Sequence, residues 1–166
     1  MRCIMGKDKT DKTNVMRLLD QKKIGYKHYT YGDGVTALSG VEVANELGLD
    51  PDQVFKTLVT YGSKTKQYYV FVIPVARELD LKKAANAVGE KSIEMIKSKE
   101  LLPLTGYIHG GCSPIGMKKF FTTTVDSSAQ AQPDIIFSAG RIGYQVQLKL
   151  DDLAKIIKFQ LADVAE

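Results

Sequence analysis

Apolar positions near the start of the chain recur at helical spacing. Val15, Leu18 and Leu19 follow a polar stretch, and this spacing predicts a first helix that runs to about Lys23. Over residues 25–31 the side chains instead alternate with a period of two, which predicts a strand. The chain therefore begins with a helix that leads into a sheet.

Residues typical of helix ends mark the next helical segments. Ser39 with Glu42 three residues later forms a capping box, and Gly48 is a helix stop, so a second helix lies between them. Asp80 is expected to cap a third helix over residues 81–88. Shorter helical pieces are expected as single turns at 50–53 and from Ser98 towards Pro103, and as a last helix over 151–157.

The remaining apolar runs predict a sheet. Residues 55–61 and 67–73 are expected to form an antiparallel hairpin, and the second strand is apolar on both faces and therefore central. Further strands are expected at 107–109, 120–125, 135–138 and 143–148. Because helices and strands do not alternate regularly, the pattern indicates a single α+β domain with a mixed, strongly curved sheet.

Composition narrows the class of protein. A chain of 166 residues with 44% hydrophobic and 25% charged residues is long enough for one real core. No apolar run has the length of a signal peptide or a membrane span, so we expect a cytoplasmic protein. The cysteines, Cys3 and Cys112, and the histidines, His28 and His109, lack metal-ligand spacing, so no metal or cofactor is expected.

The formal net charge of +4 is mild. Paired lysines could contact phosphates, although a solvated lysine-rich surface is the simpler explanation of any one pair taken alone.

Lys56 is the unusual residue of the first predicted hairpin strand. Alternation places it on the same face as the apolar residues Val54 and Leu58. Such a lysine either extends its ammonium to the rim of the sheet or points into a polar cavity. Position alone favours the rim.

Residues 110–116, GGCSPIG, form a second candidate. Glycines let backbone N–H groups approach an oxyanion closely, whereas the alternative is a tight turn with a Ser-Pro corner. Cys112 or Ser113 with His109 as base would be a nucleophile pair, but no nucleophile-elbow motif is present and a buried cysteine usually behaves as a small hydrophobe.

Three ordered motifs together resemble the YbaK/EbsC family of Cys-tRNA(Pro) deacylases. They are PDQVFKTLV at 51–59, GGCSPIG with the following MKK, and SAGRIG at 138–143, and the resemblance runs from about Asn14 to the end. It implies a curved mixed sheet, a partly closed barrel flanked by helices, like the editing domain of prolyl-tRNA synthetase. Residues 14–166 are then the deacylase domain, and residues 1–13 a poorly ordered extension.

The resemblance also implies an activity. Family members remove cysteine that prolyl-tRNA synthetase has wrongly attached to tRNA(Pro), and the substrate thiol attacks its own ester. Lys56 would anchor the substrate, and the N–H groups of Gly110 and Gly111 would stabilise the oxyanion. Substrate-binding roles fall to Tyr31, Thr57, Ser113, Ser138 and Gln145, and tRNA contacts to Lys118, Lys119 and Arg141. The implied partners are mischarged tRNA(Pro) and prolyl-tRNA synthetase, with no cofactor.

Two positions depart from the family pattern. Gln145 stands where better-known members carry an aspartate, and Arg141-Ile142 stands where Lys-Arg is common. A neutral amide can still accept and donate hydrogen bonds. Two alternatives therefore stay open: hydrolysis of another misacylated tRNA such as Ala-tRNA(Pro), and a non-catalytic module that binds tRNA or a small ligand.

Overall fold

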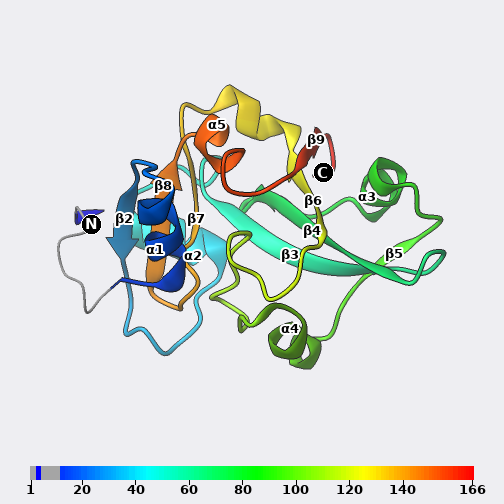
Figure 1. The fold of residues 1–166 in the computed structure, drawn as a ribbon, viewed down its shortest axis with the longest axis horizontal. Coiled ribbons are helices and arrows are strands. Elements are labelled where there is room, and N and C mark those ends of the chain that lie inside the picture. Colours follow the sequence, from blue (N-terminus) through cyan, green and yellow to red (C-terminus); the bar gives the residue numbers. More distant parts are fainter. Residues whose placement is uncertain (1–2, 5–11) are drawn as a thin grey trace.

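The computed structural model, which describes residues 3–4 and 12–166, contains two adjoining sheets (Figure 1). The four-stranded sheet is antiparallel, in the order β1 (Cys3–Ile4), β2 (Lys27–Thr30), β8 (Tyr144–Leu148) and β7 (Ile135–Ser138). The five-stranded sheet has the order β5 (Ile93–Met95), β3 (Phe55–Gly62), β4 (Gln67–Pro74), β6 (Thr122–Asp126) and β9 (Gln160–Ala162). It is mixed, because β6 runs parallel to β4 and β9.

The two sheets meet at a seam just before β3. Val54 forms an isolated parallel bridge with Ile136 of β7, and Ile136 donates its N–H to the carbonyl oxygen of Gln53 at 3.0 Å. The side-chain amide of Gln53 donates to the carbonyl oxygen of Asp134 at 3.0 Å. The predicted α+β fold with a mixed sheet is confirmed, and the strands form two sheets that are joined at this seam.

The cap residues place the early helices as predicted. α1 (Asn14–Gln21) is capped by Thr13, and α2 (Gly40–Leu47) begins with the Ser39–Glu42 capping box. α3 (Leu81–Val88) is capped by Asp80. Figure 1 shows α1 and α2 beside the four-stranded sheet, whereas α3 and α4 lie near the five-stranded sheet.

Several predictions in the second half of the chain were wrong. The single turn expected at Ser98 is the helix α4 (Ser98–Thr105), which contains Pro103. Residues 107–109 do not form a strand: residues 107–108 are irregular, and residues 109–110 form a turn in which Gly111 donates its N–H to the carbonyl oxygen of Ile108. The last helix, α5 (Leu150–Leu153), stops before the turns at 154–156. β5, β9 and the 3₁₀ helix η2 (Ser127–Ala131) were not predicted.

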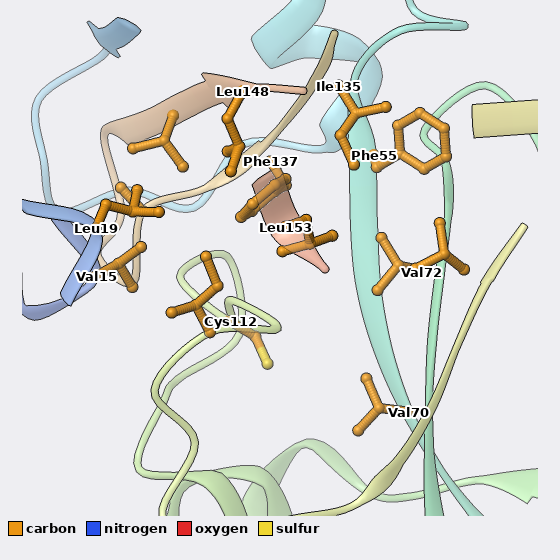
Figure 2. Close-up of a cluster of buried hydrophobic side chains, with 14 of the residues drawn as sticks. Val15, Leu19, Phe55, Val70, Val72, Cys112, Ile135, Phe137, Leu148 and Leu153 are labelled. Atoms are coloured by element: carbon orange, nitrogen blue, oxygen red, sulfur yellow. The ribbon is translucent and has the colours of Figure 1, made fainter. Parts of the chain in front are cut away.

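The core confirms that β4 is a central strand. Val70 and Val72 face the largest hydrophobic cluster, which also contains residues of α1, β7 and β8 (Figure 2). The alternate residues of β4, Tyr69, Phe71 and Ile73, face a second cluster under α3. Burying a large aliphatic or aromatic side chain contributes about 1.5–3 kcal/mol, so this strand anchors both layers.

A third cluster lies under α2, next to the seam. It joins Tyr29 and Tyr31 to Val54 and Ile136, so the two tyrosines share a buried environment, as their alternation predicts. Among the described residues, no helix has the length and apolarity needed to cross a membrane. The proposed extension over residues 1–13 lies largely outside the described residues.

Candidate active site

A cavity of about 170 Å³ opens at the seam between the two sheets. It is reached by β3, by the ends of β7 and β8, by α2 and by the loop after α4. Its polar wall contains Tyr31, Ser39, Lys56, Thr57, His109, Ser138 and Gln145, and its apolar wall contains Val43, Val54, Leu58, Val75 and Leu101. Five predicted site side chains thus surround one space, from four separate parts of the chain.

Lys56 is the cation of this cavity. Its side chain is 25% exposed, and its Nζ lies 3.6 Å from Oε1 of Glu78. Because the Glu78 carboxylate is 76% exposed, this ion pair contributes little to stability. The lysine combines the two interpretations offered by the sequence, since it lines the cavity and ends at its rim.

Strand register brings the opposite wall together. Gln145 of β8 is the direct cross-strand partner of both Ser138 on β7 and Tyr29 on β2. Directly opposed residues in antiparallel strands project to the same face. Tyr31 is held beside this row because its N–H donates to the carbonyl oxygen of Gly143 at 2.9 Å.

Two buried oxygens in the cavity wall are unsatisfied. Within the described part of the chain, neither Oε1 of Gln145 nor Oγ1 of Thr57 has a hydrogen-bond partner, and Gln145 is only 6% exposed. A buried polar group without a partner costs about 1–3 kcal/mol. Both residues line the cavity, so a bound ligand is a candidate source of the missing donors.

The glycine-rich loop contributes backbone donors, but not from the expected pair. Gly110, at φ +86°, lines the cavity and approaches Ala37 closely, whereas Gly111 donates its N–H to Ile108. Along the described chain, the N–H groups of Gly110 and Cys112 are without a protein acceptor, and both residues line the cavity. Gly110 and Cys112 are therefore the cavity-lining residues of this loop whose N–H groups are available to a ligand.

The start of α2 is a part of the site that sequence reasoning missed. Ser39 and Gly40 line the cavity, and a Cβ on Gly40 would lie 2.3 Å from Cγ1 of Val75. A helix N-terminus carries partial positive charge, which adds to that of Lys56. A glycine at the first position of a capped helix was the available signal.

Cys112 is not poised to act as a nucleophile. It is 8% exposed and belongs to the largest hydrophobic cluster (Figure 2). Burial raises the pKa of its thiol to about 12, so the thiolate is scarce at neutral pH. The interpretation of Cys112 as a small hydrophobe is confirmed.

Some predicted site residues lie away from the cavity. Ser113 is fully buried, and its Oγ accepts a hydrogen bond from the N–H of Ile115. Lys118 packs near Gly106, Lys119 lines a different groove, and the guanidinium of Arg141 lies 4.7 Å from the ring centroid of Tyr144.

Sequence comparison places these features among known proteins. The profile of the aminoacyl-tRNA editing domain matches residues 36–156. A protein of Enterococcus faecalis named Cys-tRNA(Pro)/Cys-tRNA(Cys) deacylase EbsC is 47% identical over 161 residues, which cover 96% of this chain and 98% of that protein. A proline–tRNA ligase of Pelobacter propionicus is 30% identical over 98 residues, or 59% of this chain and 17% of the ligase.

Solved structures share the fold. The structure of a hypothetical protein, APE2540, has a TM-score of 0.81 at 20% identity and covers 93% of this chain and all of that one. A structure described as a trans-editing enzyme for prolyl-tRNA synthetase has a TM-score of 0.78 at 24% identity, covering 93% of this chain and 98% of that one. At these identities the likeness concerns the fold.

Proposed function

Since the chain belongs to the family of aminoacyl-tRNA editing domains, we propose that it is the deacylase that removes cysteine from mischarged Cys-tRNA(Pro). The enzyme class follows from family membership and from a relative that covers almost the whole chain. It works in the cytoplasm, where tRNA is charged, and prolyl-tRNA synthetase is its proposed partner. Cysteine and proline are close in size, so binding alone separates them by only roughly 10- to 200-fold, and a second sieve is needed.

The observation that carries this proposal is that Lys56, two residues with unsatisfied oxygens and two residues with unpaired backbone N–H groups line one small cavity. A liquid water molecule occupies about 30 Å³, so the cavity holds roughly five or six atoms of that size. A cysteinyl group has this size. Its ammonium group has three N–H donors, which suit the oxygens of Gln145 and Thr57.

In the proposed reaction the substrate supplies its own nucleophile. The cysteine sulfur bonds to the ester carbonyl carbon and its proton leaves, and the carbonyl oxygen becomes an oxyanion. When the carbon–oxygen bond to the ribose breaks, the ribose oxygen takes up a proton, and a thiolactone and free tRNA are released. Holding thiol and carbonyl in reacting geometry can contribute roughly 7–11 kcal/mol.

Each wall of the cavity then has one task. The N–H groups of Gly110 and Cys112 stabilise the oxyanion, and the N-terminus of α2 adds favourable charge. Lys56 anchors the carbonyl or the terminal ribose. Tyr31 and Ser138 line the pocket as further hydrogen-bonding groups.

The test is deacylation of Cys-tRNA(Pro) by the purified protein. Lys56→Ala is expected to lower kcat/KM at least 100-fold, since a charged hydrogen bond and substrate alignment are lost together. Lys64→Ala is the matched control, because Lys64 is an exposed lysine on the turn between β3 and β4. Ser-tRNA should survive, because its hydroxyl is the poorer nucleophile. Loss of Ser-tRNA or Ala-tRNA(Pro) at a comparable rate would refute cyclisation and favour attack by water.

The second candidate function is a non-catalytic module that binds tRNA or a small ligand, because Gln145 stands in place of an aspartate. If the wild-type protein binds tRNA in a salt-dependent way but shows no turnover with any acylated tRNA, the binding module is correct and the deacylase is rejected.

A further inference from the structure

A second hollow lies outside the candidate active site and contains Lys119, one of the residues predicted to contact tRNA. It has a volume of about 280 Å³ and lies between residues 114–121 and residues 156–158. Lys119, Phe120 and Lys158 are among its walls. We call it the lysine–phenylalanine groove.

The groove has an exposed aromatic ring. Phe120 is 71% exposed, although its neighbour Phe121 is half-buried and packs edge-on against Tyr68. An exposed phenylalanine presents a ring face on which a nucleobase can stack. Nothing in the described structure covers that ring.

The charge of the groove is uncompensated. Lys119 and Lys158 make no ion pair with any described residue, and no aspartate or glutamate lines the groove. Nearby Lys155, by contrast, is paired with Asp152 at 2.9 Å. Two free ammonium groups beside an exposed ring are complementary to a single-stranded nucleic acid, whose phosphates and bases alternate.

The groove and the cavity are both lined by the loop that follows α4. Cys112 lines the cavity, and Pro114 lines the groove. Two residues of chain span at most about 7 Å, so this loop brings backbone of the groove close to backbone of the cavity.

The larger hollow on the other side of the cavity is less suitable for phosphates. It has a volume of about 600 Å³ and shares Tyr31 with the cavity, but Asp33 and Glu46 line it. Hydrogen bonds from Thr36 and Val35 lower the pKa of Asp33 to about 2, so its carboxylate is charged at neutral pH and repels phosphate.

We propose that the lysine–phenylalanine groove binds the unpaired 3′ strand of tRNA that precedes the ester-bearing ribose. A base stacks on Phe120, and Lys119 and Lys158 contact flanking phosphates. This inference rests on the proposed function for the identity of the strand. It predicts that the groove governs tRNA affinity and leaves the chemistry in the cavity unchanged.

The test measures binding of uncharged tRNA(Pro), and of a single-stranded RNA with its 3′ sequence, by fluorescence anisotropy. Phe120→Ala is expected to weaken binding about 5- to 100-fold, and Phe120→Tyr should retain affinity. Removing Lys119 and Lys158 together should lower the slope of log K against log salt by about 0.7 for each lysine. Lys64→Ala, away from the groove, should change the slope much less.

A second readout separates this proposal from the proposed function. With Cys-tRNA(Pro), the groove variants should raise KM and leave kcat nearly unchanged, and with a cysteinyl ester of adenosine alone they should match the wild type. If the folded variants bind tRNA with unaltered affinity and salt slope, the proposal that the groove binds RNA is rejected. The groove is also overturned if the variants lose only the binding of prolyl-tRNA synthetase. If the wild type binds tRNA through the groove but deacylates nothing, the proposed function fails and the groove stands.

Discussion

Gln145 is a residue whose side chain suits a bound ligand but lowers the stability of the ligand-free protein. Its oxygen is buried without a partner in the described structure, as is the oxygen of Thr57. Each unsatisfied group costs about 1–3 kcal/mol, and both residues line the cavity, where a ligand can supply the missing donors. The family aspartate would offer a charge here, and Gln145 offers a neutral acceptor.

Gln145→Leu should therefore separate activity from stability. The variant removes the acceptor at similar volume, so kcat/KM is expected to fall about 10- to 100-fold while the free energy of unfolding stays equal or rises. Gln145→Asp, which keeps an acceptor, should retain most of the activity. Deacylation kinetics together with urea unfolding measure both. A loss of activity in Gln145→Leu that merely follows a loss of stability contradicts substrate binding by Gln145.

Cys112→Ala should leave the reaction nearly intact. The thiol has a pKa of about 12 and contributes packing. The backbone N–H of residue 112 is unchanged by the substitution. We expect kcat/KM within about 3-fold of the wild type and a loss of stability of about 1 kcal/mol. A loss of activity of more than 100-fold in a folded variant would point to a covalent enzyme nucleophile.

At the scale of elements, local signals were sufficient for some helices and insufficient elsewhere. α2 and α3 could be predicted from Ser39 and Asp80 because capping is decided within one turn of chain. β9 could not, because its three residues are too few to show an alternation and their position depends on parallel pairing to the distant strand β6.

The residues of the candidate active site also divide into those that could be predicted from the sequence and those that could not. The motif residues Lys56 and Gln145 could be identified from the family resemblance, and strand pairing brings them to one cavity. The contribution of Gly40 depends on its contact with Val75, and the orientation of Gly111 depends on its turn with Ile108. Such contacts form between elements or through backbone rotation, and the residue pattern does not encode them directly.

Gly110→Ala tests whether the backbone conformation of the glycine-rich loop is needed for activity. Its φ of +86° is strained for alanine, and the new Cβ would lie 2.7 Å from the Cβ of Ala37. The loop must move, so kcat/KM is expected to fall at least 10-fold with a destabilisation of about 1–3 kcal/mol. Gly89→Ala, with a φ of +74° and nothing within 4 Å, is the control for strain without a clash. Adding Ala37→Gly to Gly110→Ala should restore part of the activity, and no recovery would refute the steric explanation.

At the scale of the whole molecule, Asp126 joins segments that are distant in the chain. Its buried carboxylate accepts hydrogen bonds from the N–H groups of Val164 and Ala165 and pairs with Arg77 at 3.5 Å. Burial raises the pKa of Asp126, but hydrogen bonds from Ser128, Val164 and Ala165 outweigh burial, and the pKa lies below its ordinary value. The charged carboxylate is therefore the form that the fold stabilises.

Asp126→Asn is expected to lower the free energy of unfolding by about 2–3 kcal/mol at pH 7. Because the folded pKa is lowered, this contribution is present above the unfolded value near 3.9 and is lost as the pH falls through the folded value. The difference between wild type and variant in urea unfolding should therefore shrink towards pH 3. Asp163→Asn, which breaks an exposed pair with Lys83, should cost less than about 1 kcal/mol. A difference that stays constant with pH would show that the charge of Asp126 is unimportant.

The seam at Val54 and Ile136 has a consequence for how such a protein changes over evolutionary time. The cavity is lined by residues of both sheets, and these two buried aliphatic residues join the sheets beside it, so a change in their packing is expected to change its width. Interiors are close-packed, so the gain or loss of a single methylene there is felt. Substitutions at Val54 and Ile136 are thus expected to change which acyl groups fit in the cavity, although the polar residues of the site stay the same.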